Sequence, residues 1–225
     1  MMSVLDRPVW ASLSTSHSAL SVGNALARRY APEVNLFASA CDDTLQALSA
    51  LADLVGPGER VFVLQVPEIV VPASLVALEA KGVQMTATRS ATAAGHAELR
   101  RLTDADAPEM LALAKLTEPG PFLTRTHAMG TFVGARIGGR LAAMAGERFR
   151  FPGYTEVSGV CTHPDFRGRG LARQLSAVVA AGIEARGERP FLHAWKTNRP
   201  AIALYESLGF EIRNEVNVAV LERRP

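Results

Sequence analysis

The chain of 225 residues lacks the features that mark several common protein classes. Its two cysteines, Cys41 and Cys161, lie far apart and outside any CxxC or Cys/His spacing, so we expect neither a disulfide framework nor a structural zinc. A net charge of +2, without an aromatic-interleaved basic stripe, does not indicate nucleic-acid binding. No run of 18 apolar residues and no signal-peptide pattern occurs. We therefore expect a soluble cytoplasmic protein with no metal, membrane or nucleic-acid partner.

Two common nucleotide-binding motifs are also missing. No G-x-x-x-x-G-K-[ST] string exists, and a G-x-G-x-x-G pattern fails because Arg173 occupies the last glycine position. The composition, 48% hydrophobic and 20% charged, excludes a mostly disordered chain. Any phosphate site in this globular protein must therefore be of a different kind.

Such a site is predicted by the turn Arg167-Gly168-Arg169-Gly170-Leu171-Ala172, which lies between an apolar strand-like run and a long amphipathic segment. A strand-to-helix turn presents unpaired backbone N–H groups at a helix N-terminus, where the helix dipole favours negative charge. Glycine lets an anion approach the backbone, and Arg167, Arg169 and Arg173 add cationic donors. The turn predicts a pyrophosphate cradle; the alternative is an ordinary helix start.

A second pattern follows the next apolar run. Thr197 or Asn198 can cap a helix, Pro200 suits its first turn, and a glycine at 209 ends it. Ala201 and Tyr205 then lie one turn apart on the same face. These residues could line a narrow slot; the alternative is an amphipathic helix whose tyrosine is half-buried.

Together the two segments resemble the GCN5-related N-acetyltransferase (GNAT) superfamily. Its [QR]-x-x-G-x-[GA] turn is matched by Arg167, Gly170 and Ala172. Its N-x-x-A-x-x-x-Y-x-x-x-G-F element is matched by Asn198, Ala201, Tyr205, Gly209 and Phe210, and the preceding His163-Pro164-Asp165-Phe166 is similar to the usual lead-in. Residues 159–210 are most similar to the FR47-type group, which includes glycine N-acyltransferase-like enzymes.

The order of elements divides the chain into two regions. Residues 1–94 alternate between helix and strand patterns, with helices expected at 18–30, 42–55 and 72–81 and strands at 33–40, 60–66 and 83–88 after a loose lead. The small residues 90–95 are the expected linker. Residues 95–225 then predict helices at 103–116, 171–187 and 200–208, and strands at 98–102, 131–137, 141–149, 155–162, 191–195, 210–216 and 218–222.

The resemblance implies an α/β (α+β) fold for the second region. In this GNAT fold a mixed central sheet is splayed between the fourth and fifth strands. The smaller α/β region before it could be a degenerate GNAT-like half, although its alternation also fits other folds. The domain prediction is therefore residues 1–94 followed by a GNAT domain at 95–225.

The resemblance also implies an acyltransferase that moves an acetyl group from acetyl-CoA directly to the amine of a small-molecule acceptor. Two alternatives remain open: N-acylation of an amino acid with another acyl-CoA, and a non-catalytic CoA-binding regulatory module. The protein could be a monomer or a homodimer.

The family motifs assign expected roles to particular residues. Coenzyme-binding positions are Val160, Cys161, Thr162, Arg167, Gly168, Arg169, Gly170, Leu171, Ala172, Arg173, Asn198, Ala201 and Tyr205. The N–H of Val160 or Cys161 could polarise the acyl carbonyl, and Tyr205 matches the thiolate-protonating tyrosine. Cys161 as a nucleophile is the rival interpretation.

The general base and the acceptor pocket are less narrowly defined. Glu156 is our expected base, with Glu147 and His193 as alternatives and a water relay as a further possibility. The acceptor is expected near residues 117–122 and the Glu147-Arg148 strand. A carboxylate there would favour a cationic amine, whereas Arg148 would favour a substrate acid.

Overall fold

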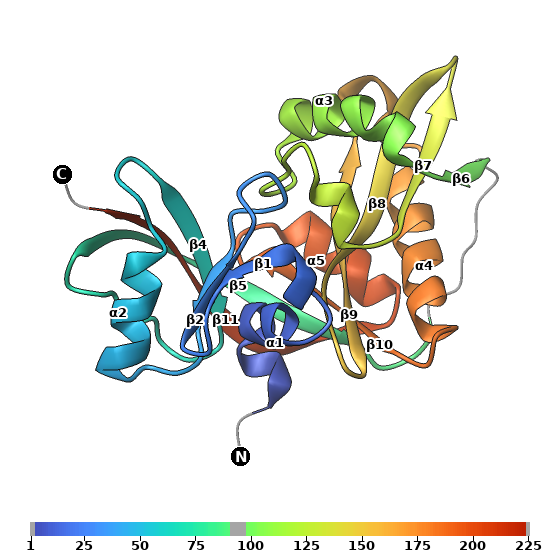
Figure 1. The fold of residues 1–225 in the computed structure, drawn as a ribbon. Helices are drawn as coiled ribbons and strands as arrows, with labels where there is room; N and C mark the ends of the chain where they lie inside the picture. Colours follow the sequence, from blue (N-terminus) through green and yellow to red (C-terminus); the bar gives the residue numbers. More distant parts are fainter. Residues whose placement is uncertain (1–2, 91–97, 224–225) are drawn as a thin grey trace.

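The computed structural model describes residues 3–90 and 98–223 (Figure 1). Its α-helices are α1 (Pro8–Ser14), α2 (Leu45–Asp53), α3 (Ala107–Thr117), α4 (Leu171–Glu184) and α5 (Arg199–Ser207). Its strands are β1 (Ser21–Gly23), β2 (Ala27–Tyr30), β3 (Ala38–Ala40), β4 (Arg60–Gln65), β5 (Leu75–Ala87), β6 (Leu99–Arg101), β7 (Phe132–Ile137), β8 (Arg140–Phe151), β9 (Tyr154–Thr162), β10 (Arg189–Trp195) and β11 (Phe210–Arg223).

The main sheet has eight strands in the order β4-β11-β5-β10-β9-β8-β7-β6. β9 and β10 pair in parallel, and the other neighbours pair in antiparallel fashion. A separate three-stranded sheet contains β1, β2 and β3. The predicted mixed α/β class is confirmed.

The first ninety residues contribute two strands to this main sheet. β5 lies between β10 and β11, so that Met85 is paired with Leu192 on one side and with Ile212 on the other. β4 pairs with the outer edge of β11. The sheet of the second region therefore includes strands from the first. The division at residue 95 stays a prediction, and residues 91–95 of the expected linker lie outside the described residues.

Two predicted helices are wrong. Residues 18–30 form a 3₁₀ turn followed by β1 and β2, because Gly23 has a φ of 124° and the Asn24 side chain accepts from the backbone N–H groups of Leu26 and Ala27. These contacts build a turn where the helix pattern continued. Residues 72–81 lead into β5, because the ladder with β11 overrides the helix propensity of their Ala, Leu, Glu and Lys residues.

Two smaller corrections concern the ends of the chain. The expected loose lead contains α1, whose Val9 and Leu13 are fully buried. The two strands expected at 210–216 and 218–222 are the single strand β11, which has a register shift between Ile212 and Asn214. The predicted β7–β8 hairpin and the helices α2 to α5 are confirmed within a few residues at their ends.

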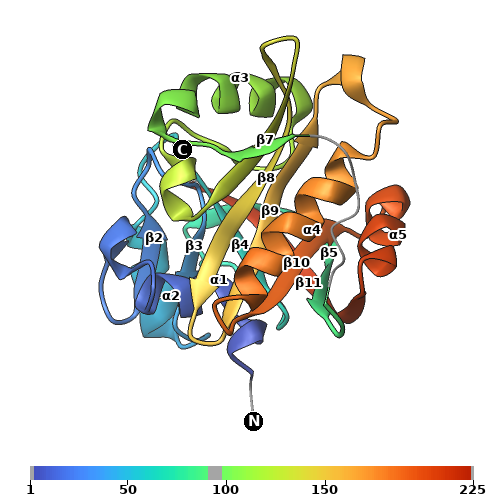
Figure 2. The same cartoon turned by 90° about the vertical axis from the view of Figure 1, so that its right-hand side faces the viewer.

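Helices cover both faces of the sheet (Figure 2). Successive strand residues point to opposite faces, and on β8 Ala143 and Ala145 pack in the cluster of α4, whereas Met144 packs in the cluster of α3. α4 and α5 thus share one face, and α1 and α3 lie on the other (Figures 1 and 2). On β4, Phe62 and Leu64 pack in the cluster of α1, whereas Val61 and Val63 pack in the cluster of α2, so α2 lies on the face opposite α1.

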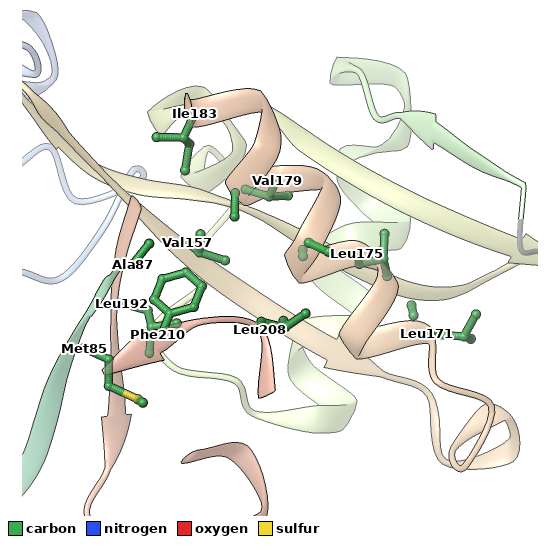
Figure 3. Close-up of a cluster of buried hydrophobic side chains, with 14 of the residues drawn as sticks. Met85, Ala87, Val157, Leu171, Leu175, Val179, Ile183, Leu192, Leu208 and Phe210 are labelled. Atoms are coloured by element: carbon green, nitrogen blue, oxygen red, sulfur yellow. The ribbon is translucent and has the colours of Figure 1, made fainter. Parts of the chain in front are cut away.

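The core beneath α4 fixes this helix to the sheet (Figure 3). Leu175 and Ile183 of α4 are fully buried with Met85 of β5 and Phe210 of β11. Each such side chain stabilises the fold by about 1.5–3 kcal/mol relative to an exposed position. The core therefore joins strands from both regions and holds the N-terminus of α4 against the end of β9.

Candidate active site

The sheet opens between β9 and β10. Their parallel ladder joins residues 154–156 to residues 189–191 and ends there. Further along, β9 continues its pairing with β8, and β10 continues its pairing with β5. Because β9 and β10 are the fourth and fifth strands counted from β6, this is the opening that the sequence predicted.

A bulge in β9 faces this opening. Ser158 pairs with Gly146 and Cys161 pairs with Met144, so that two residues of β9, Gly159 and Val160, oppose a single residue of β8. Gly159 adopts a φ of 62°, which a side chain would disfavour. Such a bulge interrupts the ladder and redirects the strand. The backbone beside Val160 is therefore irregular at the mouth of the opening.

The Arg/Gly turn forms a concave surface at the start of α4. Gly168 and Gly170 have φ values of 76° and 71°, and a Cβ added to either would meet no atom within 4 Å. Gly170 is the N-cap residue of the 14-residue α4 and provides no side-chain cap, so the first N–H groups of the helix stay open. An anion can therefore approach these groups closely.

A cavity of about 660 Å³ lies over this turn. Its lining includes the predicted coenzyme residues Val160, Cys161, Thr162, Arg167, Gly168, Arg169, Gly170, Leu171, Ala172, Arg173 and Asn198. Thr162 Oγ1 is buried and has no hydrogen-bond partner within the described residues. Open helix N–H groups and an unpartnered hydroxyl fit the pyrophosphate and the polar pantetheine chain of coenzyme A.

The three arginines of the turn differ in their contacts. Arg173 donates to Ser207 Oγ of α5 and so joins the two helices. The Arg169 guanidinium lies 5.3 Å from the centre of the Phe166 ring. Arg167, like the other two, is exposed at the cavity. The turn thus has cationic side chains on its solvent side and open N–H groups at its floor.

A second cavity, of about 280 Å³, continues through the opening. It shares Thr117, Val160 and Asn198 with the first cavity. Asn198 Oδ1 accepts from the Ala201 N–H at 3.2 Å, which confirms the predicted cap of α5. Ala201 and Tyr205 line this second cavity. The helix predicted from the Asn/Ala/Tyr pattern therefore lies where the two cavities meet.

Tyr205 lines the second cavity, and its hydroxyl is protonated. Burial, reinforced by the negative charge of Glu156, raises the pKa of Tyr205 to about 12. The ring packs on Phe210, with 6.2 Å between the ring centres. At neutral pH this hydroxyl is available as a proton donor.

Glu156 lies behind the cavity wall and is fully buried. Its Oε2 accepts from Arg148 Nε at 2.7 Å, and its Oε1 accepts from Arg148 Nη2 at 2.7 Å and contacts His193 Nδ1 at 2.6 Å. Burial opposes the charged form, but Arg148 and His193 together lower the pKa of Glu156 to about 2. This carboxylate is therefore ionised and fully engaged, and Arg148 and His193, rather than Glu156, line the second cavity.

Gln84 of β5 completes this network. Its Oε1 accepts from Arg213 Nη1 at 2.8 Å, and its Nε2 donates to the Leu5 carbonyl at 2.8 Å and lies 3.1 Å from His193 Nε2. Because the amide nitrogen is a donor, His193 Nε2 must accept, and Nδ1 carries the proton that is donated to Glu156. Burial lowers the pKa of His193, although Glu156 opposes this shift. His193 is therefore neutral at pH 7.

Two other candidates are placed away from this junction. Glu147 is buried, where its Oε1 accepts from Arg186 at 2.9 Å and its Oε2 from the Thr131 N–H at 3.2 Å. The Cys161 side chain packs with Met144 in the cluster of α3, and burial raises the pKa of its thiol to about 11. Neither residue lines the second cavity, and the Cys161 thiol is protonated at neutral pH.

Comparisons with known proteins agree with this geometry. The family model described as FR47-like protein matches residues 132–219. A GNAT-family protein of known structure from Novosphingobium aromaticivorans is 41% identical over 100% of both chains, with a TM-score of 0.93. The chain belongs to the GNAT family. It is accordingly a transferase enzyme, with the N-acetyltransferase activity of a family that uses acetyl-CoA as co-substrate.

More distant GNAT structures share the fold. A GCN5-related N-acetyltransferase from Kribbella flavida is 16% identical, covers 98% of this chain and 96% of its own, and has a TM-score of 0.66. A GCN5-related N-acetyltransferase-like protein from Streptococcus suis is 14% identical over 96% and 92% of the two chains, with a TM-score of 0.59. No curated protein matches the chain.

The second cavity of this GNAT site has a broader lining than the residues at which the sequence predicted the acceptor. Residues 117–121 and Arg148 line the second cavity, whereas Glu147 and Phe122 line only an adjoining cavity of about 10 Å³. The lining also includes residues that the sequence did not indicate, among them Phe37, Phe62, Leu64, Gly82, Val216 and Val218. No motif marks these residues, because strand pairing across the two regions brings them together.

Two general properties of the GNAT chain can be stated for residues 3–90 and 98–223. None of the helices there is both long and apolar enough to cross a membrane. These residues also contain no group of three His, Cys, Asp or Glu side chains placed to hold a metal ion. The cytoplasmic location, the metal-free site and the monomer-or-homodimer alternative stay predictions.

Proposed function

We propose that this GNAT enzyme transfers the acetyl group of acetyl-CoA directly to the amine of a small-molecule acceptor. The observation that carries this proposal is the junction of the two cavities in the opening between β9 and β10, at Thr117, Val160 and Asn198. One cavity contains the anion cradle, and the other extends to Arg148 and His193. A donor and an acceptor bound from these two sides would meet at the same point.

The coenzyme would be held mainly by backbone groups. The N–H groups of the turn at residues 168–173 would bind the pyrophosphate, and Arg167, Arg169 and Arg173 would add positive charge around it. The backbone of residues 160–162 and the free Thr162 hydroxyl would bind the pantetheine chain. Asn198 and Ala201 would border it from α5.

Three groups of the chain would then serve the transfer. The N–H of Val160 or Cys161 would stabilise the developing charge on the acyl oxygen. Tyr205 would donate its proton to the departing thiolate. Direct attack by the amine is supported by Cys161, because a thiol with a pKa of about 11 is protonated at neutral pH and is a poor nucleophile.

For Glu156 we propose a positioning role in place of the direct base. A carboxylate with a pKa of about 2 and both oxygens engaged is a weak proton acceptor. It would instead hold Arg148 and His193 on the cavity wall, and water would carry away the amine proton. Burial in a largely apolar cavity also favours the neutral form of an amine.

The test is an acceptor panel with acetyl-CoA, read by thiol release and by mass spectrometry of the product. The panel should contain alkyl and arylalkyl amines, diamines and amino acids. We expect thiol release that depends on an amine and equals the amount of N-acetyl product. Thiol release without acceptor that leaves an acetyl group on the enzyme would contradict direct transfer. Tight coenzyme binding with no acetylated amine would instead indicate a regulatory module.

A further inference from the structure

The acceptor end of the second cavity has an apolar wall built by both regions of the chain. Phe37, Phe62 and Leu64 come from the first ninety residues, and Val216 and Val218 come from β11. The Phe37 and Phe62 rings contact each other with 5.7 Å between their centres. Phe37, Phe62, Leu64 and Val218 also belong to the cluster that contains α1, which lies on the face opposite α4. This wall is therefore across the sheet from the coenzyme cradle.

The positive charge of Arg148 at this end is already neutralised by Glu156. Among the described residues that line the cavity, Arg148 and Glu118 carry charge, and His193 is neutral. Arg148 donates two hydrogen bonds to the buried Glu156, and its guanidinium lies 4.9 Å from the Phe37 ring centre and 4.5 Å from that of Phe149. Glu118 is exposed at the rim. No cation is left in this lining to neutralise an acid on the acceptor.

An acceptor carboxylate would therefore be disfavoured here. To pair with Arg148 it would have to share the guanidinium with Glu156, which places two carboxylates around one buried cation. An apolar body would instead replace water on the aromatic and aliphatic wall. The Glu118 carboxylate at the rim would attract the incoming ammonium, and burial would then favour the neutral amine that attacks.

We propose that the acceptor is a primary amine attached to an aromatic or bulky apolar body and without a carboxylate, of the arylalkylamine class. This inference rests on the proposed acetyltransferase function and names its substrate class. If the acceptor is of this class, the first ninety residues determine the acceptor specificity, since Phe37 and Phe62 form the surface that receives the apolar body.

The test compares matched acceptors on the unaltered enzyme with saturating acetyl-CoA. Phenethylamine and phenylalanine differ by the carboxylate alone, and phenethylamine and ethylamine differ by the ring. We expect kcat/KM for phenethylamine to exceed that for phenylalanine on the order of 10²-fold and that for ethylamine at least about tenfold. Equal or faster turnover of phenylalanine or ethylamine would overturn the inference while leaving the acetyltransferase function intact. If none of these amines were acetylated, the proposed acetyltransferase function itself would be contradicted.

A variant tests the wall itself. Phe62→Ala should lower kcat/KM for phenethylamine by about tenfold or more, with a change of less than about threefold for ethylamine and in the Kd of acetyl-CoA. Leu78→Ala, on the exposed part of β5, is the matched control and should change neither amine. An equal loss for both amines would contradict the assigned wall. If Phe62→Ala lowered kcat/KM only for acyl donors with a longer chain and left both amines unaffected, the wall would bind the acyl group. That result would overturn the inference.

Discussion

Replacement of Tyr205 by phenylalanine removes one hydroxyl from a residue that lines the second cavity. Within the described residues, the Tyr205 hydroxyl makes no hydrogen bond to the chain, and the ring packs on Phe210. Tyr205→Phe therefore keeps the packing and leaves no protein group unpaired. We expect the free energy of unfolding to change by no more than about 0.5 kcal/mol.

The expected loss in turnover follows from the environment of this hydroxyl. The pKa of about 12 keeps it protonated across the neutral range. A hydrogen bond to a charged group contributes about 1.5–3 kcal/mol, which corresponds to roughly 10–150-fold in rate. Proton transfer from a positioned acid extends the range to about 10²–10⁴-fold. We expect kcat to fall on the order of 10²–10⁴-fold, because the departing thiolate of coenzyme A would lie in a partly desolvated site.

The assay measures kcat by thiol release and the Kd of acetyl-CoA by calorimetry for the same protein. The Kd should change less than about threefold, since the phosphate cradle is untouched. Tyr154→Phe is a suitable control, because this half-buried tyrosine packs on Phe151 and Phe191 outside both cavities. A kcat for Tyr205→Phe within about threefold of wild type would refute the acid role and assign it to water.

Two further predictions concern the buried groups behind the site. Glu156→Gln should lower the free energy of unfolding at pH 7 by about 3–5 kcal/mol, because Arg148 stays buried without its counter-charge. The folded-state pKa of Glu156, about 2, lies below its ordinary 4.5, so this stabilisation is complete above pH 4.5 and is lost as the pH falls toward 2. The free energies of unfolding of wild type and Glu156→Gln, measured with urea, should therefore converge as the pH falls over that range. A difference between them that does not change with pH would contradict the pKa assignment. Cys161→Ala should keep kcat within about threefold, and a loss above about tenfold with intact acetyl-CoA binding would indicate a nucleophilic cysteine.

Much of the coenzyme side was predictable because it depends on local sequence. Gly168 and Gly170 are needed for left-handed backbone at the turn, and Asn198 caps the helix that contains Tyr205. Each of these features is determined within a few residues of the motif. The strands that frame the opening were also predicted, because β7 to β10 have clear apolar patterns bounded by turn residues.

The wall of the second cavity was not predictable because it depends on pairing between distant segments. β5 was expected to begin as a helix, and only its two-sided pairing with β10 and β11 makes it a strand. That pairing places Gln84 beside His193. The pairing of β4 with β11 brings Phe62 into the cavity lining, and Phe37 bridges to Phe62 and lies against Arg148. The contacts of Glu156, the expected base, could not be predicted for a similar reason. Glu156 is engaged by Arg148 of the neighbouring strand and His193 of the next, which the spacing along the chain does not reveal.

The central claim is that the turn at residues 167–173 binds acetyl-CoA for transfer, and calorimetric titration of Gly170→Glu tests it most directly. Gly187→Glu is the matched control, because both glycines have left-handed φ values, 71° and 76°, and open space where a Cβ would lie. We expect one acetyl-CoA per chain, with similar Kd, for wild type and Gly187→Glu, and no measurable binding for Gly170→Glu. Equal binding by all three proteins, or a stoichiometry near two, would contradict the account.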